Sequence, residues 1–378
     1  MTETILTNAN LILPDQVLHG TLLIRNGRIA EISEQISHAP SAIDLEGDDV
    51  IPGIVDVHTD NLERQVQPRI AARWPSRSAM LAHDAQCAVA GVTTVFDALC
   101  LGDLGFDTSR MQTFHDGMAD ITALAPSGLL KSEHFIHLRC ELPAVGMIEL
   151  VDPVADHPLV TMVSFMDHSP GVGQYANLDR YRAMRIRSGI APDKVESRMQ
   201  ELLAQRARLR DPNRQWLLAR VRGRHLALLS HDDQLESEIA ENFADGIMIS
   251  EFPVTHEAAN AAKARGMQVV AGAPNIVRGG SHSGNVAAID LVRAGTVDAF
   301  ASDYVPAALA EAAYLAHAQA GIPLPAAVAL ITDTPAKMAH LPDRGRLEPT
   351  LRADLVRIRR HENTPIVRAV WREGERVA

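Results

Sequence analysis

Eight short apolar runs, separated by segments with helical periodicity, constrain this chain more than any other feature. The runs occupy residues 51–58, 91–99, 134–141, 159–168, 226–231, 246–253, 267–274 and 297–303. Continuous apolar runs of this length are typical of parallel strands that are buried on both faces. Eight strand–helix units in succession predict a TIM-like (β/α)₈ barrel.

The two ends of the chain carry a different pattern. Residues 1–52 hold short strand-like runs with a hairpin-turn signal at Asn26-Gly27, and residues 343–378 have the same character. We therefore expect both termini, residues 1–52 plus 343–378, to build one small β-sandwich. The barrel domain is then predicted to cover residues 53–342.

Composition narrows the class of protein. A chain of 378 residues with 46% hydrophobic and 22% charged residues fits a water-soluble enzyme, and no apolar stretch reaches the roughly 18 residues of a membrane helix. The net charge of −11 argues against a nucleic-acid partner. The amino terminus lacks a basic start and a cleavage site, so we expect a cytoplasmic protein. Cys87, Cys100 and Cys140 fit no zinc-knuckle spacing and are expected to be buried, reduced thiols.

Imidazoles and carboxylates finish five of the eight runs. They are His58 and Asp60, Glu141, Asp167 and His168, His231 with Asp232 and Asp233, and Asp303. In a barrel the carboxyl ends of the strands meet at one rim, where the active site lies. So many polar groups would repel one another or be poorly solvated there unless cations neutralised them. The pattern predicts a site for two divalent metal ions.

The spacing in His58-Thr-Asp60 supports this interpretation. Residues two apart point to the same side of an extended strand, so both side chains can face the barrel mouth. Each polar residue also has an ordinary structural explanation: His168 can cap the following turn, and Glu141 can pair with Arg139. Their joint placement at strand ends favours the metal centre.

The segment 272–285 has the properties of a phosphate-binding loop. Its glycines let backbone N–H groups approach an anion, a helical pattern follows it, and Arg278 and His282 add positive charge. An ordinary surface loop of the same composition is the alternative interpretation.

Positive charge gathers in two islands of this acidic chain. Residues 180–224 hold thirteen Arg or Lys against four Asp or Glu, and residues 64–82 hold four arginines and no acid. Such islands can bind a small, highly charged anion. A solvated helix face, or a contact between subunits of a homo-oligomer, explains them equally well.

With these residues in view, the chain resembles the amidohydrolase superfamily in outline. The resemblance rests on the terminal β-sandwich, on "IPGIVDVH" entering the barrel, and on a late "SD" and "ADLV". More specifically it resembles the phosphonate-pathway branch, the PhnM family, through "VDVHTDN", "HLRCELP", "MDHSPG", "SHDD", "EFP", "GAPNIVRGGSHSGN" and "SDY". Enzymes of that family hydrolyse α-D-ribose 1-methylphosphonate 5-triphosphate to the 5-phosphate and pyrophosphate, ahead of carbon–phosphorus bond cleavage. The resemblance implies the same metal-dependent activity here.

Roles for individual residues follow as expectations. Two divalent metals, zinc in the first place with manganese or iron as alternatives, are expected on His58, Asp60, Glu141, His168, His231 and Asp303. Asp303 is expected to act as the general base for an attacking water. Phosphate contacts are expected from Arg139, Arg278 and His282, with Arg69, Arg73 and Arg77 as further candidates.

The chain departs from the wider superfamily in three respects. Asp60 replaces the second histidine of the usual His-x-His motif, and the histidine ligands fall on the fourth and fifth runs instead of the fifth and sixth. The usual carboxylated lysine has no counterpart at a strand end, so Glu141 is assigned as the metal bridge. Asn61 receives no role.

Two other functions remain open on the sequence. The first is hydrolysis of a cyclic amide or deamination of a base, which would use the same metals without a phosphate-binding loop. The second is a non-catalytic scaffold subunit in a phosphonate-degrading assembly, which would bind little metal.

Overall fold

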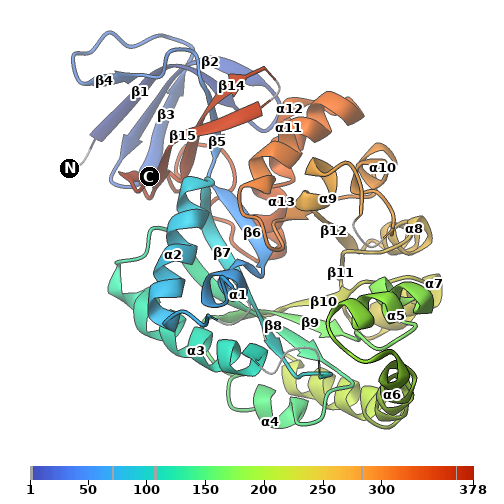
Figure 1. The fold of residues 1–378 in the computed structure, drawn as a ribbon. Helices are drawn as coiled ribbons and strands as arrows, with labels where there is room; N and C mark the ends of the chain where they lie inside the picture. The colour runs from blue at the N-terminus through green and yellow to red at the C-terminus, as the bar shows by residue number, and fades with distance from the viewer. Residues whose placement is uncertain (1–2, 70–71, 106–108, 282–283, 363) are drawn as a thin grey trace.

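Eight parallel strands, β6 to β13, curve into a barrel in which neighbours in sequence are neighbours in space (Figure 1). The computed structural model describes residues 3–69, 72–105, 109–281, 284–362 and 364–378. The first and last barrel strands meet where Thr59 pairs with Asp303 in parallel, and the Asp303 N–H donates to the His58 carbonyl at 3.0 Å. The barrel is therefore nearly closed, and the predicted (β/α)₈ architecture is confirmed.

Each of the eight apolar runs overlaps one barrel strand. The strands are β6 (Ile54–Thr59), β7 (Val92–Leu101), β8 (Glu133–Glu141), β9 (Val160–Met166), β10 (Ala227–His231), β11 (Ile249–Glu251), β12 (Gln268–Gly272) and β13 (Ala299–Ala301). Every residue of β6 and β7 is buried. Burial on both faces explains why these strands are continuously apolar instead of alternating.

Helices follow the barrel strands along the chain, and most of them cover the outside of the barrel (Figure 1). They are α1 (Asn61–Val66), α2 (Ser76–Val89), α3 (Ser109–Leu124), α4 (Met147–Val151), α5 (Leu178–Arg187), α6 (Pro192–Val221), α7 (Glu236–Ala244), α8 (His256–Ala264), α9 (Ala273–Val277), α10 (Ala288–Arg293), α11 (Ala308–Ala320), α12 (Leu324–Ala329) and α13 (Asp333–Met338). Two 3₁₀ turns, η1 (Ala125–Ser127) and η2 (Gly173–Tyr175), complete the helical elements of the described residues.

The remaining strands come from both termini and form one mixed sheet. They are β1 (Glu3–Ile12), β2 (Val17–Arg25), β3 (Arg28–Ser33), β4 (Ala42–Asp44), β5 (Asp49–Pro52), β14 (Leu355–His361), β15 (Thr364–Arg372) and β16 (Glu375–Arg376). The order is β16-β15-β14-β5-β1-β2-β3, with β4 beside β1; β5 runs parallel to β1 and antiparallel to β14. The prediction that both ends build one β unit is confirmed.

Apolar side chains fill the space around and between these layers. One buried cluster joins barrel strands through Phe96, Met162 and Ile249. Another large cluster lies between the barrel, α11 and the terminal sheet, and includes Phe300 and Val356. Because these cores hold the strands rigidly, the side chains at the strand ends have defined positions.

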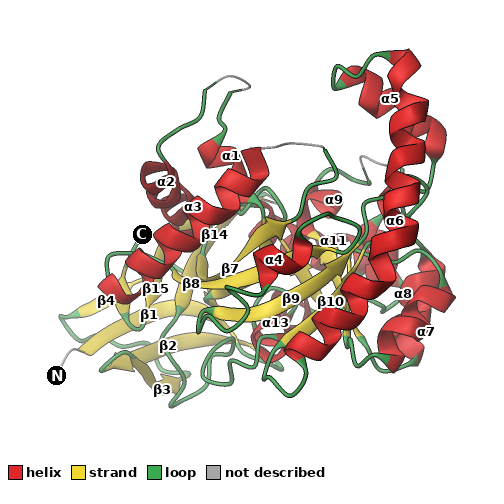
Figure 2. Ribbon diagram, turned by 90° about the horizontal axis from the view of Figure 1, so that it is seen from below, coloured by secondary structure: helices red, strands yellow, loops and turns green. Residues whose placement is uncertain are grey.

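A helical hairpin made of α5 and the start of α6 projects away from the barrel (Figure 2). The longer basic island lies along these two helices. Several of its arginines pair with nearby carboxylates: Arg182 with Asp179 and Glu196, Arg210 with Glu241, and Arg220 with Asp152 and Asp156. Much of this island is therefore an ion-paired, solvated helix surface.

Two further features bear on the chain as a whole. Among the helices of the described residues, none combines the length and the apolar character that crossing a membrane requires. Cys87, Cys100 and Cys140 are all buried free thiols.

Gly53 joins the terminal sheet to the first barrel strand. A substitution there tests how tightly this junction is packed. A Cβ atom there would lie 2.2 Å from Thr93 Oγ1 and 2.8 Å from Asp354 Cβ. Gly53→Ala should therefore lower the free energy of unfolding by about 3 kcal/mol through overpacking. Denaturant unfolding measures the change. Gly246→Ala, where a Cβ meets nothing within 4 Å but φ is +80°, should cost only about 1 kcal/mol. Equal losses in the two variants would contradict the packing argument.

Candidate metal centre

A cavity of about 490 Å³ opens at the carboxyl ends of the barrel strands. This volume suits a small-molecule ligand. All six residues predicted to bind metal line it: His58, Asp60, Glu141, His168, His231 and Asp303. The barrel thus brings together side chains that are up to 245 positions apart in the sequence (303 minus 58).

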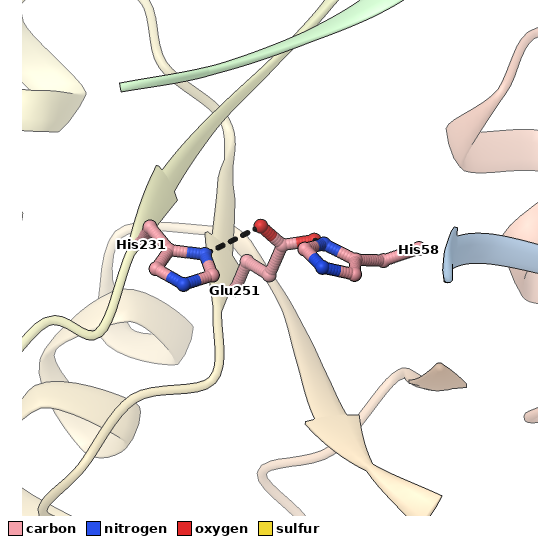
Figure 3. A group of neighbouring side chains, drawn as sticks. All are labelled: His58, His231 and Glu251. Atoms are coloured by element: carbon pink, nitrogen blue, oxygen red, sulfur yellow. Dashed lines mark hydrogen bonds and ion pairs between the residues drawn. The ribbon is translucent and has the colours of Figure 1, made fainter. Parts of the chain in front are cut away.

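Glu251, at the end of β11, lies between two imidazoles (Figure 3). The Nδ1 atom of His58 lies 2.7 Å from Glu251 Oε1, and the Nδ1 atom of His231 lies 2.8 Å from Oε2. Because an ionised carboxylate only accepts hydrogen bonds, both histidines carry a proton on Nδ1. The Nε2 atoms are then free to bind a metal, as in the common carboxylate–histidine–metal arrangement.

Glu141 orients the imidazole of His168 in the same way. Its Oε2 lies 2.6 Å from His168 Nδ1, and its Oε1 accepts the His168 backbone N–H at 2.9 Å. Both carboxylate oxygens are thus directed at one residue. The contacts fix the ring and leave His168 Nε2 facing the cavity, while the expected bridging role of Glu141 stays a prediction.

Two groups of ligand atoms lie side by side in the cavity. In the first, His58 Nε2 is 3.5 Å from Asp60 Oδ1, with Asp303 close to both. In the second, Asp232 Oδ2 lies 3.8 Å from the Nε2 atoms of both His168 and His231. Ligand atoms of one tetrahedral ion with bonds of about 2.1 Å are about 3.4 Å apart. The observed separations therefore fit two metal ions.

The electrostatics of His58 also fit a cation. Its Nε2 atom is buried and has no hydrogen-bond partner among the described residues, a state that costs about 1–3 kcal/mol. Burial disfavours charge on the ring, yet the Glu251 and Asp60 carboxylates raise the pKa of His58 to about 10. A field that favours a proton at this nitrogen favours a bound metal ion in its place.

Three residues at the rim adopt left-handed backbone conformations. Asp232, Phe252 and Asp303 have φ of +58°, +56° and +55° and follow β10, β11 and β13. Such conformations cost about 1–3 kcal/mol each and gather at functional sites. Each donates a backbone hydrogen bond to a neighbouring strand that holds it in place; the Asp232 N–H, for example, donates to the Glu251 carbonyl at 2.9 Å.

Asp60 and Asp303 differ in their surroundings. Burial raises the pKa of Asp303, and the nearby Asp60 charge raises it further. Burial acts on Asp60 as well, but the Arg139 guanidinium and His58 hold the pKa of that carboxyl below its usual range. Arg139 Nη1 lies 2.7 Å from each Asp60 oxygen, so Arg139 neutralises Asp60, and its expected contact with phosphate stays a prediction.

The Gly-rich segment forms one wall of the cavity. Arg278, Gly280 and Ser281 line it, just after the short helix α9. Gly279 and Gly280 have φ of +75° and +153°, conformations that favour glycine. Among the described residues the Arg278 side chain forms no ion pair, and His282 lies outside them.

Three arginines of the shorter basic island, Arg69, Arg73 and Arg77, lie outside the cavity. Arg73 pairs with Asp116 at 2.7 Å and Arg77 with Asp120 at 3.0 Å. Neither arginine lines the cavity, and neither does Arg69. The structure therefore does not bring these three predicted phosphate contacts to the metal centre.

Three residues of the site received no role from sequence reasoning. Asp232 directly follows His231, so its position at the end of the fifth run could have selected it. Glu251 lies inside the sixth run, and only the structure shows that β11 ends there. Arg110, at the start of α3, also lines the cavity and lies 3.4 Å from Glu63. No sequence signal distinguishes Arg110 from other helix arginines.

Comparison with solved structures agrees with this fold. The chain aligns with an amidohydrolase at a TM-score of 0.63, with 16% identity over 99% of this chain and 98% of that one. It aligns with dihydropyrimidinase from Brevibacillus agri at 0.64, with 11% identity over 99% and 95% of the two chains. N-acetylglucosamine-6-phosphate deacetylase from Pasteurella multocida gives 0.63, with 13% identity over 99% of each chain. The fold is that of the amidohydrolase superfamily.

Sequence comparison goes further, although no protein-family model matches the chain. The chain is 42% identical over 376 residues to alpha-D-ribose 1-methylphosphonate 5-triphosphate diphosphatase of Escherichia coli K12, covering 99% of this chain and 100% of that protein. D-hydantoinase of Ralstonia pickettii is 25% identical over 164 residues, 43% of this chain and 33% of that protein. The protein belongs to the family of the alpha-D-ribose 1-methylphosphonate 5-triphosphate diphosphatases.

The shared carboxylate of Glu251 gives a testable prediction. In Glu251→Gln the amide cannot accept equally from both Nδ1–H groups, so metal affinity should fall about 10- to 100-fold. Competition with a chelating dye measures the affinity. Glu149→Gln, an exposed residue of α4, is the control and should bind metal normally. Unchanged affinity in Glu251→Gln would show that the two histidines need no common anchor.

Proposed function

We propose that this protein hydrolyses α-D-ribose 1-methylphosphonate 5-triphosphate to the 5-phosphate and pyrophosphate, as a step of phosphonate catabolism. The observation that carries the proposal is full-length identity of 42% to an enzyme named for that activity. The cavity supports it independently, because imidazoles, carboxylates and arginines line one space of suitable size.

The proposal includes two divalent metal ions, zinc first, with manganese and iron as alternatives. One ion would be held by His58, Asp60 and Asp303, and the other by His168, His231 and Asp232. When bound, the ions would supply Lewis acidity and lower the pKa of a water molecule. The bridging role expected for Glu141 from the sequence stays a prediction; because both of its oxygens accept from His168, we also propose that Glu141 orients this histidine.

Asp303 is the proposed general base. A water oxygen forms a bond to the α-phosphorus while the bond from that phosphorus to the oxygen leading to the β-phosphorus breaks. The proton of the water passes to Asp303, and pyrophosphate leaves with its electron pair. Burial and the neighbouring Asp60 raise the pKa of Asp303, which makes it a better proton acceptor than an ordinary aspartate.

Cationic and N–H groups of the cavity wall match the charge of the substrate. Arg278 and Arg110 lie on this wall, and the Gly-rich segment after α9 offers backbone N–H groups. Charge-assisted hydrogen bonds to phosphate are about twice as strong as neutral ones. These groups would also stabilise the charge that develops on the leaving pyrophosphate.

A substrate panel tests the proposal against amide hydrolysis. Metal-loaded protein is incubated with the ribose methylphosphonate triphosphate, a nucleoside triphosphate and a cyclic amide, and release of pyrophosphate, ammonia and acid is followed. Pyrophosphate from the first compound alone is the expected result. Hydrolysis of the amide only would overturn the proposal, and purified protein without metal or turnover would favour a scaffold subunit.

Asp303→Asn tests the general base. The amide cannot accept the proton, so kcat should fall by about 10³-fold or more. Substrate binding should stay within a few-fold of normal, since the phosphate-binding wall is intact. Single-turnover kinetics and equilibrium binding separate the two effects. Turnover near the normal rate would refute the assignment of Asp303.

Arg278→Ala tests the phosphate-binding wall. Loss of one charge-assisted contact, worth about 1.5–3 kcal/mol, should reduce kcat/KM for the triphosphate about 10- to 150-fold. Arg73→Ala, which removes an arginine that lies outside the cavity, is the matched control and should retain kcat/KM. Equal effects of the two substitutions would argue for a general charge effect.

A further inference from the structure

A second polar cluster is buried outside the barrel, between α2 and strands β7 and β8. Asp97 of β7 accepts from His83 Nε2 at 2.6 Å and from His134 Nδ1 at 2.7 Å. His134 Nε2 lies 3.2 Å from Asp84, which also accepts the backbone N–H groups of residues 131 and 132. None of these four side chains is more than 5% exposed.

The hydrogen bonds of this cluster have one consistent direction. Both nitrogens of His134 face carboxylates, so both donate; burial opposes the charge, but Asp97 and Asp84 raise the pKa of His134 to about 9. His83 donates from Nε2 to Asp97, which leaves its Nδ1 atom as an acceptor. The contacts of 2.6–2.7 Å are direct hydrogen bonds, and they account for the cluster without a metal ion.

The acceptor on His83 faces Asn61. Asn61 Nδ2 lies 2.9 Å from His83 Nδ1 and 3.1 Å from Gln86 Oε1, while its own Oδ1 accepts from Gln65 at 3.4 Å. Asn61 is 1% exposed. Its amide orientation is therefore fixed, because only the NH₂ group can serve both acceptors.

Asn61 connects the cluster to the metal centre through the chain itself. It is the first residue of α1, and Asp60 stands immediately before it at the start of the helix. The backbone N–H of Asp60 donates to the Asp303 carbonyl. Holding the Asn61 side chain therefore restrains the backbone on which the Asp60 carboxylate is carried.

We propose that Asn61, His83, Asp97, His134 and Asp84 form a positioning network that holds Asp60 opposite His58 Nε2 for metal binding. The network acts from outside the barrel, where no member can touch substrate. Fully satisfied buried polar networks are rigid and favour a single arrangement. The inference rests on the metal site proposed above, and it assigns to Asn61 the role that the sequence left open.

Asn61→Ala is the principal test. It removes the bond to His83 without substituting any side chain that lines the cavity. The affinity for Zn²⁺, measured by competition with a chelating dye, should fall at least about 10-fold, as for other groups that orient metal ligands. Gln65→Ala is the matched control, because Gln65 lies on the same helix and bonds to Asn61 and Gln86 but not to His83. It should bind Zn²⁺ normally.

Two measurements distinguish a role of Asn61 in positioning Asp60 from a role in the stability of the fold alone. Thermal unfolding of both metal-free variants is measured alongside, so that a stability loss without an affinity loss in Asn61→Ala would overturn the proposal. If that variant does not fold, His83→Gln replaces it. Its NH₂ group can still donate to Asp97, but its acceptor Oε1 does not occupy the position of the imidazole Nδ1 that Asn61 contacts, so the same fall is expected. Normal Zn²⁺ affinity there would equally overturn the network. Failure of the wild-type protein to bind Zn²⁺ would instead remove the proposed metal site.

Discussion

One buried carboxylate, Glu251, supports the arrangement of the whole cavity. It accepts from the Nδ1 atoms of both His58 and His231 at 2.7 and 2.8 Å, and so couples the first barrel strand to the fifth. Burying a carboxylate is costly unless it is fully hydrogen-bonded. The two imidazoles, together with Ser164 at 3.0 Å, meet that requirement. The carboxylate also fixes both imidazole rings with their Nε2 atoms toward the cavity, the orientation that they need to bind a metal ion there.

Other polar side chains hold residues of the metal centre in the same way, through direct hydrogen bonds or ion pairs. Glu141 fixes His168 from within the rim, Arg139 neutralises Asp60 beside it, and the network ending at Asn61 restrains Asp60 from outside the barrel. Each polar group is satisfied by a neighbour on another strand or helix. Because the carboxyl ends of all eight parallel strands lie at one rim, the barrel gathers the polar groups of the metal centre there and leaves apolar packing, such as that around Phe96, inside.

Much of this was accessible from the sequence. Buried parallel strands are continuously apolar, so all eight runs could be recognised, and the polar residues that end them include every member of the predicted ligand set. Recognition failed where a residue's neighbours in space decide its role. Arg73 and Arg77 resemble phosphate contacts in composition but pair with acids of α3, whereas Arg110 is inconspicuous in sequence and lines the cavity.

The sequence by itself determined the barrel, the terminal β unit and the ring of imidazoles and carboxylates, because periodicity and strand-end position are local properties of the chain. The tertiary structure decided which carboxylate serves which histidine. Glu251 and Glu141 orient three imidazole rings through hydrogen bonds between residues that are 193, 20 and 27 positions apart in the sequence. No local pattern encodes such pairings. Asn61 illustrates this difference between sequence and structure. The sequence shows only that it follows the His-x-Asp motif, whereas in the fold its side chain links that motif to a buried network.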